Sequence, residues 1–221
     1  MAIRKDGIEN KEKLLKAAAE IFAEKGYRNA TIAEICKHAG SNIAAIHYHF
    51  GSKDELYKEV WKRAFEEAMK VYPADGGLPP DASAKQKLRA LVYSHIHRIL
   101  DGGKLGFSGQ ILLREMAEPT EAISQIHHDV IIPLRKRMDQ ILRELLGPLA
   151  TEKDIHFCEL SVVHQCLAFG FRKGRKKLPP IFTDDELREG LTDQLADHIV
   201  IFSLAGIAAV RAKLELQKKD N

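Results

Sequence analysis

The sequence predicts an all-α protein, and three observations support that prediction. Apolar residues recur at helical spacing through most of the 221 residues, whereas almost no segment alternates with a period of two. Residues that favour helix N-termini, with a carboxylate three positions later, precede several of these segments. Glycine or proline follows most of them, as expected at helix ends.

Composition restricts the class of protein. The formal net charge is only +3, with a sequence pI near 8.7, so any binding of nucleic acid must come from a local patch. The three cysteines form no CxxC pair, which indicates a reducing compartment. No export signal is evident at the N-terminus, and the longest apolar run is too short for a bilayer, which takes about 20 residues. We expect a cytoplasmic protein that does not bind membranes.

A helix-turn-helix is predicted within residues 31–53. Thr31 and Glu34 have the spacing of a capping box, and Gly40 stands where a helix needs a left-handed residue to end. Asn42 is a good N-cap for a second helix that runs to Phe50. A helix from Asn10 to Gly26 precedes this pair, and a third member, residues 52–72, follows it. Two helices joined by a glycine-containing corner are typical of proteins that place the second helix in the DNA major groove.

The charge pattern agrees with DNA binding. Residues 35–53 contain no Asp or Glu, although 29% of the chain is charged. A surface that contacts phosphate should lack carboxylates and carry cations and neutral donors. The alternative for this segment is a plain helical hairpin with a weakly basic face.

The segment resembles the DNA-binding domain of the TetR family of transcriptional regulators. The resemblance covers about residues 8–60 and is carried by Gly26-Tyr27, Thr31, Ile35, Ala39-Gly40, Ala45-Ile46-His47-Tyr48-His49-Phe50, Ser52-Lys53 and Glu55-Leu56. Residues 42–46 are more similar to the CecR-like subgroup. So are Leu113-Arg114-Glu115, Pro119-Thr120, Ile132-Pro133-Leu134 and Ala168-Phe169.

The predicted DNA-binding residues combine the pattern with the resemblance. The set is Thr31, Asn42, Ile43, Ala44, Ala45, His47, Tyr48, His49 and Lys53. Small or apolar groups at the start of the second helix can meet a thymine methyl group, although packing is the alternative for Ile43. The resemblance implies phosphate contacts for His47 and Tyr48. The family most often has Tyr where this chain has His47, but a neutral imidazole still donates one hydrogen bond. Lys53, at a helix start, is predicted to bind phosphate, and a solvated lysine is the alternative.

The remaining chain reads as a second helical domain. We divide the chain into a DNA-binding domain, residues 8–68, and a regulatory and dimerisation domain, residues 69–221. The expected helices of this second domain span residues 84–100, 105–117, 119–146, 151–171 and 192–216, with a further short helix after Thr183. The helix through residues 52–72 connects the two domains.

The last helix predicts a homodimer. From Ile199 to Val210 it is apolar almost all round, and such a helix must be buried on more than one side. A second copy of the chain is the simplest partner, and the TetR resemblance implies the same four-helix interface. The alternative is a central helix in a monomer. The predicted interface residues are Ile199, Phe202, Gly206, Ile207 and Val210.

A pocket for an unknown small molecule is implied by the resemblance. Scattered polar residues of the second domain would be costly to bury unpaired, and pockets need a few such groups. The candidates are Gln110, Arg114, His127, His164 and Gln165. For each residue taken alone, exposure or an internal partner is the alternative.

No catalytic, metal or cofactor site is legible. His95 and His97 are two apart and lie on different faces of a helix, and no spacing matches a zinc motif. We therefore expect a non-enzymatic, ligand-responsive repressor that binds a palindromic operator as a homodimer. A helical metal-binding protein or enzyme using His95, His97 and His164 is the alternative, and a constitutive DNA-binding protein is a third.

Overall fold

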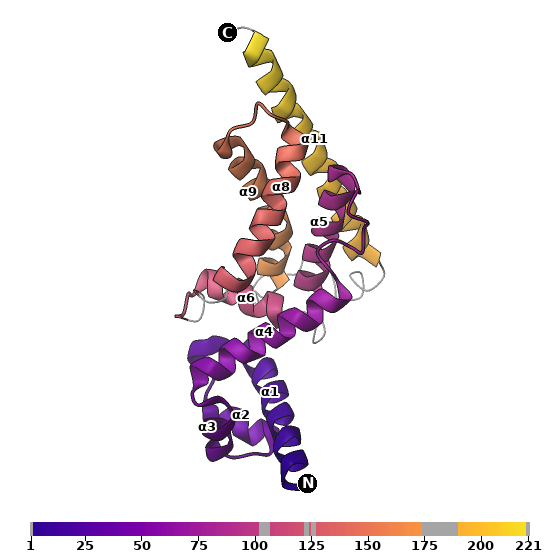
Figure 1. Cartoon of the computed structure of the whole chain (residues 1–221). Helices are drawn as coiled ribbons and strands as arrows, with labels where there is room; N and C mark the ends of the chain where they lie inside the picture. The colour runs from indigo at the N-terminus through magenta and orange to yellow at the C-terminus, as the bar shows by residue number, and fades with distance from the viewer. Residues whose placement is uncertain (1, 102–106, 122–123, 125–126, 174–189, 220–221) are drawn as a thin grey trace. The chain divides into compact units, whose positions relative to one another are not determined.

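The computed structural model describes residues 2–101, 107–121, 124, 127–173 and 190–219, and within them every regular element is helical (Figure 1). The all-α prediction is therefore confirmed. The elements are α1 (Ala2–Asn29), α2 (Ile32–Ala39), α3 (Ile43–Phe50), α4 (Lys53–Val71), α5 (Ala84–Leu100), α6 (Phe107–Ala117), the π-helical turn η2 (His127–Ile131), α8 (Ile132–Leu146), α9 (Glu152–Lys173) and α11 (Thr192–Lys219). None of the described helices is both long enough and apolar enough to cross a membrane.

The chain forms two compact units. The first contains Met1–Ala68 and Gly103–Ile126, and the second contains Met69–Gly102 and His127–Asn221. Helix α6 thus belongs to the same unit as the helix-turn-helix, although it follows α5 in sequence. The division at residues 68 and 69 into two functional domains stays a prediction.

The core of the first unit is built from apolar side chains of its first four helices. Leu14 and Phe22 of α1 are fully buried, together with Ile35 of α2 and Ile46 of α3. The ring of Tyr57 on α4 packs edge-on against Phe22, with the ring centroids 4.8 Å apart.

Helix α1 differs from its prediction at its N-terminal end. It begins at Ala2 and not near Asn10, because residues 2–10 contain helix-forming Ala, Arg, Lys and Glu and no proline. The predicted stop is present, since Gly26 adopts a left-handed conformation with φ of 76° inside the span assigned to α1.

Helix α6 packs on α1 and is bound to α4 by buried polar contacts. The indole N–H of Trp61 donates to the Ser108 carbonyl at 3.2 Å, and the Tyr57 hydroxyl donates to Glu115 Oε1 at 2.7 Å. Glu115 is only 2% exposed and also accepts from the backbone N–H and the hydroxyl of Thr120. A buried carboxylate with this many donors fixes α6 against the connector helix.

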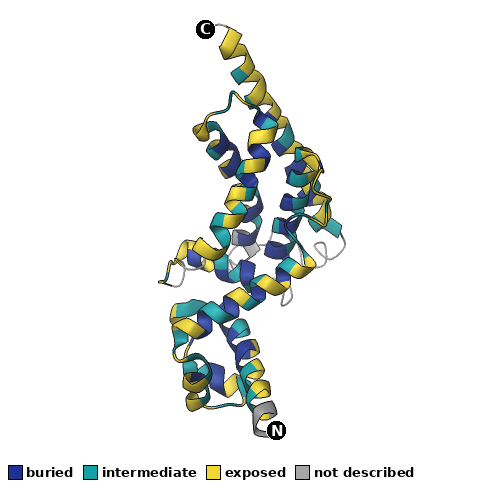
Figure 2. Ribbon diagram, viewed as in Figure 1, coloured by how far each residue is buried: buried dark blue, intermediate teal, exposed yellow. Residues whose placement is uncertain are grey.

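The second unit is a helical bundle in which α5 contacts α8, α9 and α11. The buried faces of these helices, dark blue in Figure 2, meet in a core that includes Leu88, Ile96, Leu142 and Ala196. Helix α5 has the predicted bounds and opens with a capping box between Ser83 and Gln86.

The segment between α6 and α8 departs from the prediction. A single helix from Pro119 to Leu146 was expected, but Pro119 lies in irregular backbone and the α-helix begins at Ile132. Pro133 is the proline in the first turn, where its missing N–H costs nothing. The short helix expected after Thr183 lies outside the described residues.

Candidate nucleic-acid interface

Caps fix the ends of α2 and α3. The Thr31 hydroxyl accepts from the Glu34 N–H, and the Glu34 carboxylate accepts from the Thr31 N–H at 3.1 Å. Gly40 ends α2 with φ of 62°, and Asn42 Oδ1 accepts from the Ala45 N–H at 2.9 Å. The predicted capping roles of Thr31, Gly40 and Asn42 are confirmed.

Helix α3 presents one side to solvent. Ile46 is fully buried in the core of the first unit, so the residues on the opposite side point outward. Tyr48 is 85% exposed and Ile43 is 50% exposed. Ala44 and His47 are exposed, whereas Ala45 is half-buried. We call Ile43, Ala44, His47 and Tyr48 the outer face of α3.

His49 is half-buried beside this face. Its ring lies between those of its sequence neighbours, with centroids 5.0 Å from Tyr48 and 6.0 Å from Phe50. This packing leaves the His49 side chain less exposed than that of Tyr48.

The His47 ring has a defined proton position. Its Nδ1 lies 2.9 Å from the carbonyl oxygen of Gly51. A carbonyl only accepts, so Nδ1 carries the hydrogen, and Nε2 of the neutral ring is left as an acceptor. The neutral ring therefore has no outward N–H to donate to a phosphate group. This corrects the expectation from sequence that a neutral His47 donates one hydrogen bond to DNA. Only the protonated ring can donate, through Nε2.

Lys53 and Tyr27 lie together beside the C-terminal end of α3, at the edge of the candidate interface. The Lys53 ammonium lies over the Tyr27 ring, 4.3 Å from its centroid, at the first residue of α4. Partial burial lowers the pKa of Lys53, which the nearby Asp54 carboxylate opposes. The Tyr27 hydroxyl donates to Asp54 Oδ1 at 2.6 Å. A cation held over a ring at a helix N-terminus is in a suitable position to meet a phosphate group.

Carboxylates near the interface have partners. Glu34 pairs with Lys25 at 2.7 Å, and Glu20 Oε2 lies 2.8 Å from His38 Nε2. These pairs reduce the negative field that would otherwise oppose a polyanion.

Exposed apolar side chains mark a second surface, on α9 and α11. Phe157 and Leu160 of α9 are exposed, as are Ile201 and Phe202 of α11, with Phe202 63% exposed. The two helices contact each other, and Gln165 donates to the Ser203 hydroxyl at 3.3 Å. Large exposed apolar groups on neighbouring helices are typical of interaction surfaces.

The predicted dimer residues divide between the two sides of α11. Phe202 and Gly206 are exposed and Val210 is half-buried. Ile199 and Ile207 are buried within the protomer, at 1% and 4% exposure, so their side chains are not available to a partner. The interface prediction is corrected at these two positions, because residues at i and i+8 share the side of α11 that packs on its own bundle.

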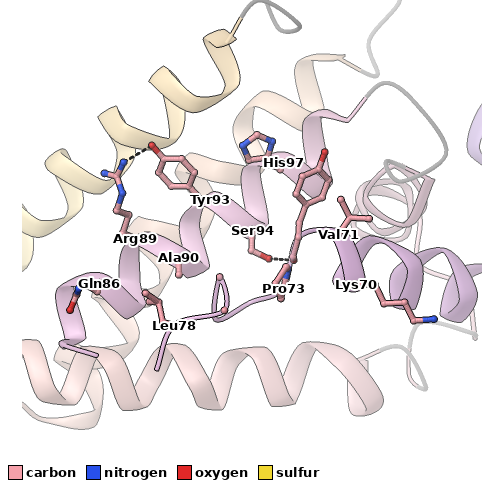
Figure 3. Close-up of a pocket in the computed structure, with 13 residues that line it drawn as sticks. Lys70, Val71, Pro73, Leu78, Gln86, Arg89, Ala90, Tyr93, Ser94 and His97 are labelled. Carbon is pink, nitrogen blue, oxygen red and sulfur yellow. Dashed lines mark hydrogen bonds between the residues drawn. The ribbon is translucent and has the colours of Figure 1, made fainter. Parts of the chain in front are cut away.

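A cleft of about 750 Å³ lies in the second unit, between the end of α4 and α5 (Figure 3). Tyr72, Arg89, Tyr93 and His97 contribute to its lining, and their partners hold them in place. The His97 ring stacks on Tyr72 and its Nε2 lies 2.8 Å from an Asp193 oxygen. Arg89 donates to the Tyr93 hydroxyl at 2.8 Å, the contact dashed in Figure 3. The volume is suitable for a small organic molecule.

None of the five predicted ligand residues lines this cleft. Gln110 and Arg114 belong to the first unit, and His127, His164 and Gln165 to the second, so no single unit contains the set. The Arg114 guanidinium donates to the carbonyls of Ala23 and Glu24, next to the break at Gly26. His164 and Gln165 bond to carbonyls of their own helix, those of Leu160 and Ser161. No sequence pattern distinguished the cleft, since its residues come from the end of α4, the loop after it and α5.

The histidines of the alternative reading do not converge on a metal site. Among the described residues, no group of three or more His, Cys, Asp or Glu side chains is arranged to hold a metal ion. Arg98 Nη2 lies 3.3 Å from His95 Nδ1, and burial, together with this cation, lowers the pKa of His95 to about 3. His97 pairs with Asp193 on the other side of α5.

Comparison with known proteins agrees with this geometry. Residues 14–60 match the model of the tetR family of bacterial regulatory proteins, and residues 84–207 match that of the C-terminal domain of the HTH-type transcriptional dual regulator CecR. The chain is 29% identical over 206 residues to the CecR regulator of Shigella flexneri, covering 87% of this chain and 91% of that one.

Solved structures show the same fold. A tetR-family regulatory protein from Rhodococcus RHA1 superposes with a TM-score of 0.64 at 20% identity, over 90% of this chain and 96% of that one. The transcriptional regulator FadR from Bacillus subtilis, in complex with stearoyl-CoA, gives 0.63 at 18% identity, over 88% and 98%. Both matching family models describe transcriptional regulators, and this favours a regulator over the enzymatic alternative. The chain belongs to the TetR family of transcriptional regulators and carries a C-terminal domain of the CecR type.

Proposed function

We propose that this regulator is a ligand-responsive repressor that binds a palindromic operator as a homodimer. The observation that carries the proposal is the outer face of α3, which is exposed, free of carboxylates and fixed at both ends by caps. A helix of this kind fits the major groove, with Lys53, Tyr48 and His49 at its border for phosphate. Thr31 and Asn42 contribute by fixing the two helices.

A second copy of the chain supplies the second helix-turn-helix, α2 and α3, for the other half of the operator. The exposed apolar side chains of α9 and α11, Phe202 among them, are covered when two copies of the chain pair. Gly206 adds room for close approach, because no atom lies within 4 Å of the position a Cβ would take. A two-fold pair of heads matches two half-sites about 34 Å apart, one helical turn of DNA.

A small molecule in the second unit alters operator affinity. The cleft beside Tyr72 is the location that the structure supports for this ligand, because its lining includes the last turn of α4. Helix α4 itself begins at Lys53, directly after α3 and Gly51-Ser52, so it links the cleft to the outer face. We take α4 to have two positions, only one of which suits operator binding. A ligand that binds one position of α4 more tightly than the other shifts the protein toward that position, and the change in operator affinity is limited by this difference in ligand affinity. The Bacillus subtilis FadR structure, which holds stearoyl-CoA, is consistent with ligand binding in this fold.

The test is a gel-shift titration of full-length protein on the DNA upstream of its own operon at moderate salt. Ala44→Asp should abolish the specific shift by placing a carboxylate on the outer face, while the exposed position keeps the fold unchanged. Gln217→Glu adds the same charge at the exposed end of α11 and should bind normally. Specific binding by the Ala44→Asp variant equal to that of the parent would refute the assigned interface.

A further inference from the structure

Helix α3 lacks the side chains that usually read bases by paired hydrogen bonds. Residues 43–50 contain no Arg, Lys, Asn, Gln, Asp or Glu. Arg or Lys reads guanine, Asn or Gln reads adenine, and Asp or Glu accepts from cytosine in the major groove. A helix without these residues needs another means of selecting a sequence.

The nearest amide is already engaged. Asn42 precedes α3, and its Oδ1 accepts the Ala45 N–H at 2.9 Å as the helix cap. Bidentate recognition of adenine requires the oxygen and the amino group of one amide to face the same base edge, whereas the cap keeps this oxygen turned toward the Ala45 N–H.

The histidine of the outer face is limited in the same way. His47 has Nδ1 on the Gly51 carbonyl, which leaves a single ring atom, Nε2, facing outward. One ring nitrogen cannot form a bidentate contact with a base edge.

What remains at the start of α3 is apolar. Ile43 is half exposed and Ala44 is exposed, and both stand in the first turn, the part of a recognition helix that reaches base edges. The C5-methyl group of thymine is the apolar group that an unmodified base pair presents in the major groove. Burying it against a side-chain methyl removes apolar surface from water on both sides of the contact.

We infer that the operator half-site is read chiefly through thymine methyl groups, which Ile43 and Ala44 contact. The inference rests on the proposed function, because it assigns the readout of the same α3 surface. Tyr48, 85% exposed, and Lys53 then set register on the backbone and carry little sequence information.

The experiment replaces thymine by deoxyuridine, which removes only the methyl group. The probe is the duplex that full-length protein selects from a random-sequence pool, with each thymine substituted in turn and affinity measured by fluorescence anisotropy. Loss of one buried methyl group should weaken binding about fourfold at each thymine under α3. Thymines outside the footprint should tolerate the change.

Two variants assign the contact. In Ile43→Ala, which shortens an exposed side chain to a good helix former, the deoxyuridine penalty should vanish at one thymine of each half-site and persist elsewhere. Lys53→Gln should weaken the thymine and deoxyuridine duplexes by the same factor, because phosphate contacts do not sense the methyl group.

A complementary substitution restores the contact. At a position where cytosine replaces a critical thymine, 5-methylcytosine should recover part of the affinity that cytosine loses. Specific binding that is unchanged by deoxyuridine at every thymine, yet lost on 7-deazaguanine or 7-deazaadenine, would overturn the inference and leave the proposed function standing. A pool in which no sequence is enriched would instead refute the proposed function.

Discussion

Helices α3 and α11 both expose apolar side chains, but local caps determine the exposed side of α3, whereas long-range packing determines that of α11. Helix α3 spans Ile43–Phe50, and caps at Asn42 and Gly51 leave Ile46 as its only fully buried residue. Helix α11 spans Thr192–Lys219 and buries a continuous side that includes Ile199, Ser203 and Ile207. The outer face of α3 is thus determined locally, whereas the exposed side of α11 depends on which of its apolar sides packs on its own bundle.

The largest expected effect separates the two sides of α11. Ile207→Asp places a carboxylate in the core of the second unit and should cost about 4 kcal/mol or more, enough to unfold it. Phe202→Asp should keep the helical circular dichroism spectrum and halve the mass measured by sedimentation. A folded Ile207→Asp dimer, together with an unfolded Phe202→Asp chain, would reverse this assignment of sides.

The second-largest expected effect tests whether α6 stabilises the first unit, which carries α3. Glu115→Gln replaces an acceptor with an amide group whose N–H groups oppose the N–H of Thr120 and should cost about 2 kcal/mol in denaturant unfolding. Tyr57→Phe removes only the donor to that carboxylate and should cost about 1 kcal/mol. In the double variant the two costs should not add, because both residues act through one contact. Additive costs would mean that the hydrogen bond contributes nothing.

The pH dependence of stability should come from the unit that contains α11. The folded-state pKa of His95 is about 3, below the ordinary 6.5, so the unfolded chain binds a proton that the folded chain excludes. His95 therefore costs no stability above about pH 6.5 and makes the chain less stable as pH falls toward 3, by about 2 kcal/mol at pH 5. Denaturant midpoints measured from pH 7 to 5 should decline less in His95→Leu. Parallel declines in the variant and the parent would exclude His95 as the cause.

The smallest effect separates the cap of α3 from its role at DNA. Asn42→Ala removes the acceptor for the Ala45 N–H and should cost about 1 kcal/mol of stability. Asn42→Asp keeps a capping oxygen, so its unfolding midpoint should match the parent while its operator affinity falls through repulsion of phosphate. Equal operator affinity in Asn42→Asp and the parent would place Asn42 away from the DNA.

Local signals made the head predictable from sequence. Thr31, Gly40 and Asn42 each act within three or four residues, so their spacing alone located α2 and α3 and indicated that Ala44 and Tyr48 face outward. The tautomer of His47 was beyond such reasoning, because it depends on where the Gly51 carbonyl lies after the helix ends.

Long-range packing explains what the sequence did not reveal. Arg114 was predicted to be a polar group of a ligand pocket, yet its hydrogen-bond partners are backbone carbonyls 90 and 91 residues away in the sequence. Ile199 and Ile207 carried the same apolar signal as Phe202, and only the placement of α5, α8 and α9 distinguishes them. The cleft has no motif, because Tyr72, Arg89 and His97 come together through the turn between α4 and α5.

The central claim is that two copies of the outer face of α3 read one duplex, and hydroxyl-radical footprinting of full-length protein on its selected operator tests it most directly. The account predicts two protected half-sites about one helical turn apart, related by two-fold symmetry, both lost in Ala44→Asp. Protection by Phe202→Asp should require a much higher protein concentration. A single unpaired protected segment, or protection that survives Ala44→Asp, would contradict it.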